Sequence, residues 1–217
     1  SNMTFAGSGE LDNGWSVDLS IAHKNAALYS TTTVTIGVPG LGDFLIIQGG
    51  SGTGIDRMDD MTPTVWEEAY GTGLGHTMDT VSGASGGAGV EFTPSDMTPD
   101  GLTARLSFSP NVSGSGSADK GSSAVDTGVK GSGWDITLEA TDALTGMEGL
   151  TLYGGISEVE VDASGTTHAG DVSEETFGVK YAVGGFTLGY QWSEEDNGRA
   201  TTATKYTNDG YGITFAI

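Results

Sequence analysis

The sequence predicts an all-β protein, an antiparallel up-and-down transmembrane β-barrel of about eleven strands with a long loop folded inward. Two observations predict this fold class. Apolar and polar residues alternate in one short segment after another, and tight turns alternate with long polar connections along the chain. A membrane barrel needs both features, because it has short turns at one end, longer loops at the other, an apolar outside and a polar lumen. A soluble sandwich would bury its apolar face against a second sheet, and its turn lengths need not alternate.

The composition limits the function. The chain of 217 residues reads as one barrel domain over 1–217, and its 8 basic against 29 acidic residues give a formal charge of -21. Such a chain repels nucleic acid and favours cations. It has no cysteine, so disulfides and thiolate metal sites are excluded, and no apolar run is as long as a membrane helix.

The first half of the chain carries strands before a long interruption. Asn13-Gly14 is a hairpin signal between alternating runs, and Trp15, Val17 and Leu19 fall on one face of the second run while Asp18 falls on the other. The run from Phe44 to Ile47 is apolar on both faces, which predicts cover on its inner side. The predicted strands are 3–11, 15–23, 32–38 and 43–48.

Residues 49–87 form the longest connection and break this rhythm. A loop of this length in a compact chain is functional or disordered, and its mixed apolar and acidic content favours a segment that packs on something. Its middle, 56–70, reads as helical, with Thr62 as a cap and Pro63 in the first turn. The segment is expected to fold into the barrel and narrow it, with a short helix over 62–70 and Trp66 as the apolar anchor.

The second half returns to alternation. Leu102, Leu106 and Phe108 alternate with Arg105, and Phe177 and Val179 alternate with Lys180. The predicted strands are 88–93, 101–109, 134–140, 150–161, 175–182, 185–193 and 210–217. Polar links are expected at 110–132, 162–174 and 194–208.

The hairpins GELDNGWSVDLSIAH and FGVKYAVGGFTLGYQW, with an inserted loop carrying IDRMDDMTPTVWEEAYG, resemble the general porins of Gram-negative bacteria, specifically the alphaproteobacterial outer-membrane family. In sixteen-stranded porins the constriction loop follows the fifth strand, whereas here it follows the fourth, and the chain ends in Ala216-Ile217 rather than a terminal aromatic. The sequence therefore resembles an interior fragment that lacks the first and last strands. The resemblance implies a trimer in the bacterial outer membrane, in contact with its lipid, and a passive channel for small hydrophilic solutes.

The charged residues supply the candidate sites. In a porin, loop carboxylates face basic residues on the lumen wall. The predicted constriction residues are Asp56, Asp59, Asp60, Glu67, Glu68, Arg105 and Lys180. The predicted lumen-facing residues are Asp18, Asp135 and Glu139, which share the inner phase of their strands. Arg57 is interpreted as an ion-pair partner within the acidic cluster. The competing interpretations are a solvated acidic loop and charges at strand ends in water.

Catalytic and metal chemistry find little support. His23, His76 and His168 form no ligand motif, and no serine lies in a nucleophile elbow, so no enzyme is predicted. Asp-rich loops can bind Ca²⁺, but DRMDD lacks the spacing of a dedicated calcium loop, so no cofactor is predicted. The leading hypothesis is a diffusion channel selective for cations. The alternatives are a non-channel surface or structural β-protein, such as an adhesin or a soluble β-sandwich, and an outer-membrane enzyme barrel.

Overall fold

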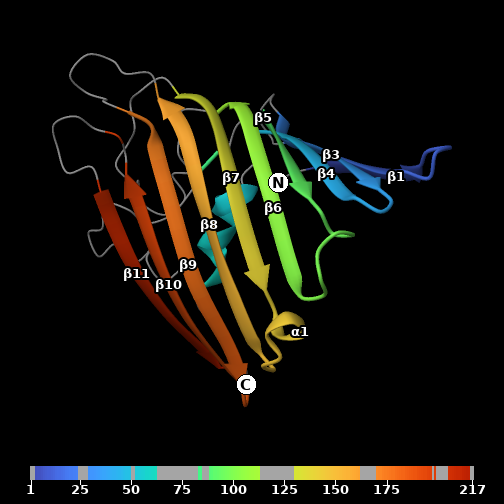
Figure 1. Ribbon diagram of the computed structural model, residues 1–217. Coiled ribbons are helices and arrows are strands. Elements are labelled where there is room, and N and C mark those ends of the chain that lie inside the picture. Colours follow the sequence, from blue (N-terminus) through green and yellow to red (C-terminus); the bar gives the residue numbers. More distant parts are fainter. Residues whose placement is uncertain are drawn as a thin grey trace.

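Eleven strands form one antiparallel sheet in the computed structural model, which describes residues 3–23, 29–49, 52–62, 83–84, 88–112, 130–161, 170–196, 198 and 205–215 (Figure 1). The strands are β1 (Met3–Glu10), β2 (Ser16–His23), β3 (Tyr29–Val38), β4 (Gly42–Gln48), β5 (Ala88–Thr93), β6 (Leu102–Asn111), β7 (Lys130–Ala140), β8 (Leu150–Val161), β9 (Val172–Val183), β10 (Phe186–Asp196) and β11 (Lys205–Phe215). The order in space is the order in sequence, from β1 to β11. The predicted all-β, antiparallel up-and-down fold class is therefore confirmed.

The apolar face of the sheet is turned outward and the polar face inward. On β6, Leu106 and Phe108 are 46% and 51% exposed, whereas the alternating Ser107 and Ser109 are 7% and 1% exposed. The same inversion holds on β7, where Ile136 is exposed and its neighbours are buried. A water-soluble sheet does the reverse, because it hides apolar side chains in a core.

Several strands extend further than the sequence predicted. Strand β9 begins at Val172 and β10 continues to Asp196, so 172–174 and 194–196 belong to the sheet rather than to the polar links. Strands β6, β7 and β11 likewise take in 110–111, 130–133 and 205–209. These polar stretches satisfy their backbone groups by pairing with neighbouring strands, and hydropathy does not report such pairing.

The described helical part of the long connection is a 3₁₀ helix, η1 (Gly54–Met61), which begins two residues before the stretch 56–70 that reads as helical in the sequence. Residues three apart align in a 3₁₀ helix, and the spacing of Ile55, Met58 and Met61 places these apolar side chains on one side. Residues 63–70, with Trp66, lie outside the described residues. A second short helix, α1 (Asp142–Thr145), lies in the connection between β7 and β8.

η1 lies behind β7, β8 and β9 in Figure 1, on the polar side of the curved sheet. Ile47 of β4 is also buried on this side, at 7% exposure, while Ile46 on the opposite side is 45% exposed. The predicted inner cover of this strand is thus present. Within the described residues, no helix has the length and apolar character needed to cross a membrane.

Candidate functional site: the insert on the inner face of the sheet

We call the long connection 49–87 the insert. Its described residues, 52–62 and 83–84, pack on the inner face of the sheet. Ile55 and Met58 are fully buried against Tyr153 of β8, and Met61 packs on the same cluster. Gly155, two residues along β8, leaves the space for Ile55, because a Cβ atom there would lie 3.2 Å from Ile55 Cγ1. A second apolar cluster joins Ala84 of the returning insert to valines near the long-loop end of the sheet; its other members are Val112, Val159, Val161 and Val172.

Hydrogen bonds hold η1 at its C-terminal end, next to its apolar contacts. Thr62 Oγ1 donates to Gln191 Oε1 on β10 at 3.1 Å, and Tyr153 Oη donates to the same oxygen at 3.0 Å. Gln191 is 1% exposed, so both bonds are shielded from water. On the neighbouring strands β9 and β10, Thr176 Oγ1 lies 3.0 Å from Ser193 Oγ. The end of η1 is therefore joined to β8 and β10 through one buried amide.

Arg57 forms an ion pair with Glu91 on β5, a residue outside the acidic cluster in which its partner was expected. In this pair a base of the insert meets an acid of the wall. Glu91 also accepts the backbone N–H of Gly54 at 2.8 Å and the hydroxyl of Ser107 at 3.1 Å. Glu91 therefore holds the insert to the wall, because its carboxylate accepts hydrogen bonds from Arg57, Gly54 and Ser107.

The predicted basic residues lie on the inner phase of their strands. Arg105 of β6 is paired with Thr137 in the register, and its Nη1 lies 3.9 Å from Glu139 Oε2 on β7. Lys180 of β9 is half-buried and lies opposite Gly189 in the register, on the side shared with Gln191. Arg105 therefore meets a carboxylate of the wall.

The predicted acidic residues are spread over the inner face. Asp135 of β7 is buried at 1% exposure beneath the insert, whereas Asp18 of β2 is exposed and lines a shallow depression with residues of β1 and β3. Asp56 of η1 accepts the backbone N–H of Gly52. The side chains of Asp59 and Asp60, and all of Glu67 and Glu68, lie outside what the structure describes. Among the described residues no group of three or more His, Asp or Glu side chains could hold a metal ion.

Sequence reasoning missed four residues that hold the insert. Glu91 lies between the outward Val90 and Phe92, so the period-two rule that placed Arg105 inward would have found it. Glu174 was assigned to a link, although it is a buried residue of β9. Tyr153 and Gln191 stand on the inner phase of β8 and β10, but nothing in the sequence shows that they meet.

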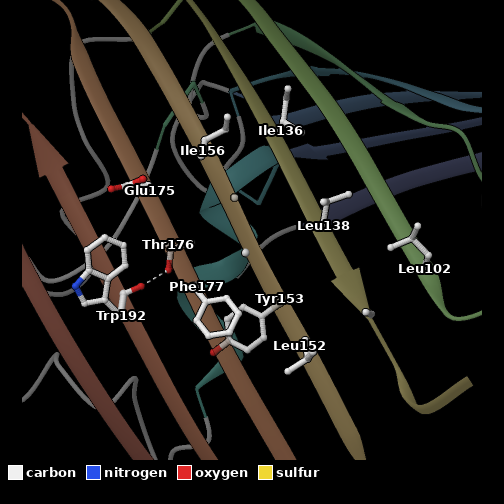
Figure 2. A pocket seen from close by; sticks show the side chains of 13 residues that line it. Leu102, Ile136, Leu138, Leu152, Tyr153, Ile156, Glu175, Thr176, Phe177 and Trp192 are labelled. Carbon is white, nitrogen blue, oxygen red and sulfur yellow. Dashed lines mark hydrogen bonds between the residues drawn. The ribbon is translucent and has the colours of Figure 1, made fainter. Parts of the chain in front are cut away.

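The outer face carries an apolar belt with a charged border. On β8 the outward positions run Leu150, Leu152, Gly154 and Ile156, and the next is Glu158. On β9 and β10 the apolar positions likewise end at Glu175 and Glu194. Figure 2 shows side chains of this face, Ile136, Leu138, Ile156, Phe177 and Trp192, around a groove of about 520 Å³ at Gly154. An apolar belt bounded by charge is the surface that a lipid bilayer requires.

Similarity to one solved structure identifies the fold. It is a porin refined at 1.8 Å resolution, which this chain matches with a TM-score of 0.58, 13% identity, and coverage of 99% of this chain and 72% of that chain. The fold is a porin fold. A double mutant of Rh. blastica porin also matches, at 16% identity, a TM-score of 0.38 and coverage of 99% of this chain and 89% of that chain. No protein-family model and no curated protein matches the sequence. The resemblance to porins is thus confirmed in the fold.

Proposed function

We propose that this protein is an outer-membrane porin, a passive diffusion channel for small hydrophilic solutes and ions. The observation that supports this most directly is the inverted sheet, with apolar side chains exposed on the outside and polar side chains on the inside. In a bilayer this arrangement is stable, because the outer belt meets lipid and the inner face meets water. The porin fold adds support, and so does the insert, whose described residues pack on the inner face of the sheet.

The proposed solute path follows the inner face past the insert. Arg57 and Arg105 are each paired with a wall carboxylate, Glu91 and Glu139 respectively. The whole chain carries 29 acidic against 8 basic residues. An excess of carboxylates along a narrow, partly desolvated passage attracts cations and repels anions. We therefore propose cation selectivity, with Asp56, Asp59, Asp60, Glu67 and Glu68 as the insert's contribution and Asp18 and Lys180 as wall charges.

The apolar belt supports a location in the bacterial outer membrane, in contact with lipid, and we propose a homotrimer as the porin resemblance implies. We propose no cofactor, no nucleic-acid partner and no enzymatic activity. The rival function, a non-channel surface or structural β-protein, differs in one measurable property: it would not conduct ions.

The test is a conductance measurement on the purified protein in a planar bilayer. A porin needs detergent for purification and produces discrete conductance steps that are ohmic at low voltage. Protein that stays monomeric and soluble without detergent, and leaves the bilayer conductance at its background value, would overturn the proposal. Heat-denatured protein from the same preparation is the control for contaminating channels.

A further inference from the structure

A row of buried polar residues crosses the inner face of the sheet at one level. The register pairs Glu91 on β5 with Ser107 on β6, then Asp135 on β7, Ser157 on β8 and Glu174 on β9. Carboxylates and serines alternate along these five strands, and each side chain is at most 7% exposed. We call these five residues the carboxylate row. Three buried carboxylates are stable only where hydrogen-bond donors meet them.

The donors come from the two ends of the insert. The backbone N–H of Gly54, at the start of η1, donates to Glu91 at 2.8 Å. On the returning side, the N–H of Ala84 donates to Asp135 at 3.1 Å and that of Gly83 donates to Glu174. Each carboxylate of the row therefore accepts a main-chain bond from the insert. A hydrogen bond to a charged group contributes more than one between neutral groups.

The contact is close enough to require glycine at two positions. A Cβ atom on Gly54 would lie 1.9 Å from Asp135 Oδ2, and one on Gly83 would lie 2.5 Å from Asp135 Oδ1. Both residues have positive φ, +56° and +53°, which side-chain-bearing residues rarely adopt. Gly54 and Gly83 thus each approach a different oxygen of one carboxylate, and Asp135 is in close contact with both ends of the insert.

We infer that Glu91, Asp135 and Glu174 are positioning residues, which set how far the insert stands from the wall and hence the width of the passage. The effect on the width of the passage rests on the proposed channel function. The attachment of the insert to the wall, which we call its seating, does not. One consequence concerns selectivity: because these carboxylates are at most 7% exposed, the carboxylates that passing ions contact directly lie elsewhere on the insert and on the uncovered wall.

Amide hydrogen exchange on the detergent-solubilised full chain tests the seating directly. Glu174→Ala removes one acceptor, and Glu175→Ala is a matched control, since the adjacent side chain is exposed on the outer face. In Glu174→Ala, we expect amides of 52–62 and 83–84 to exchange about ten- to a hundredfold faster, while strand amides and the control stay unchanged. Unchanged exchange of the insert would overturn the inference.

A second pair of variants changes residues of the insert and leaves the carboxylate row itself unchanged. Gly54→Ala drives a methyl group into Asp135, whereas Gly52→Ala also has positive φ, +86°, but meets nothing within 4 Å. If the amides of the insert exchange faster in Gly54→Ala than in Gly52→Ala, the result supports the positioning role of the carboxylate row even if Glu174→Ala fails to fold. Equal exchange in the two glycine variants contradicts it, because backbone strain alone would then explain the effect.

Conductance separates this inference from the proposed function. A seated insert predicts steady single-channel currents in the wild type and frequent partial closures in Glu174→Ala and Gly54→Ala, but not in Glu175→Ala or Gly52→Ala. If the wild type does not conduct while exchange responds as expected, the channel function fails and the seating stands. If the wild type conducts and none of the variants changes either exchange or current steadiness, the positioning role fails and the channel function stands.

Discussion

The hydroxyl of Thr62 donates a 3.1 Å hydrogen bond to the side-chain oxygen of Gln191, a residue 129 positions further along the chain. The same oxygen accepts the Tyr153 hydroxyl at 3.0 Å. One amide on β10 therefore holds the end of η1 and the aromatic ring beneath it.

Gln191→Ala should lower the free energy of unfolding by about 1–3 kcal/mol, because it leaves two buried hydroxyls without their acceptor. Urea unfolding in detergent micelles, followed by tryptophan fluorescence, measures the change. Gln48→Ala on β4 is the control, since that side chain is exposed, and it should stay within about 0.5 kcal/mol of wild type. Equal losses in the two variants would show that the buried amide has no special role.

Gly178 of β9 leaves room for the ring of Tyr153. A Cβ atom at Gly178 would lie 2.1 Å from Tyr153 Cζ, so Gly178→Ala should cost about 1–3 kcal/mol of stability by overpacking. Tyr153→Ala in the same chain should remove most of this added cost, which makes the double variant non-additive. Gly7→Ala, with nothing within 4 Å of its Cβ, is the control. Simple additivity in the unfolding experiment would place the ring elsewhere.

The outer face distinguishes a membrane barrel from a soluble β-protein. Ile156→Lys puts a charge in the apolar belt and should destabilise the protein in lipid vesicles by about 2–4 kcal/mol if this position lies near the bilayer midplane, and by less near its border. Glu158→Lys, on the same face of the same strand, lies beyond the belt and should have a small effect. Unfolding titrations of both variants in vesicles measure the difference. A tolerated Ile156→Lys would favour the soluble alternative.

Cation selectivity should depend on the insert's carboxylates. Replacing Asp59 and Asp60 with Asn, and Glu67 and Glu68 with Gln, should shift the reversal potential under a salt gradient towards zero selectivity, without unfolding the barrel. The preference should also weaken at high salt, because the Debye length falls from about 10 Å at 0.1 M to about 3 Å at 1 M. Glu158→Gln with Glu160→Gln, both exposed on the outer side of β8, is the control. An unchanged reversal potential in the insert variant means that the insert is not the selectivity filter.

The sequence alone determined the repeating part of this protein. Side chains alternate across a strand with a period of two, so the opposite sides of Arg105 and Leu106 follow from one alternating run. The same local rule, with the alternation of short and long connections, predicted an antiparallel meander with an apolar outside. It would also have turned Glu91 inward had it been applied to 88–93.

Only the tertiary structure decided what the inner face holds. Gly54 and Glu91 are 37 positions apart, and Gly83 and Glu174 are 91 positions apart, so no local pattern records that they meet. Their contacts depend on the register that brings Glu91, Asp135 and Glu174 to one level, and a shift of one residue would turn all three outward. The insert could likewise be recognised by its length, but the packing of Ile55 and Met58 against Tyr153 could not. Alternation is a property of single strands, whereas a seat for the insert is a property of several strands in register, and that register is fixed only when the sheet assembles.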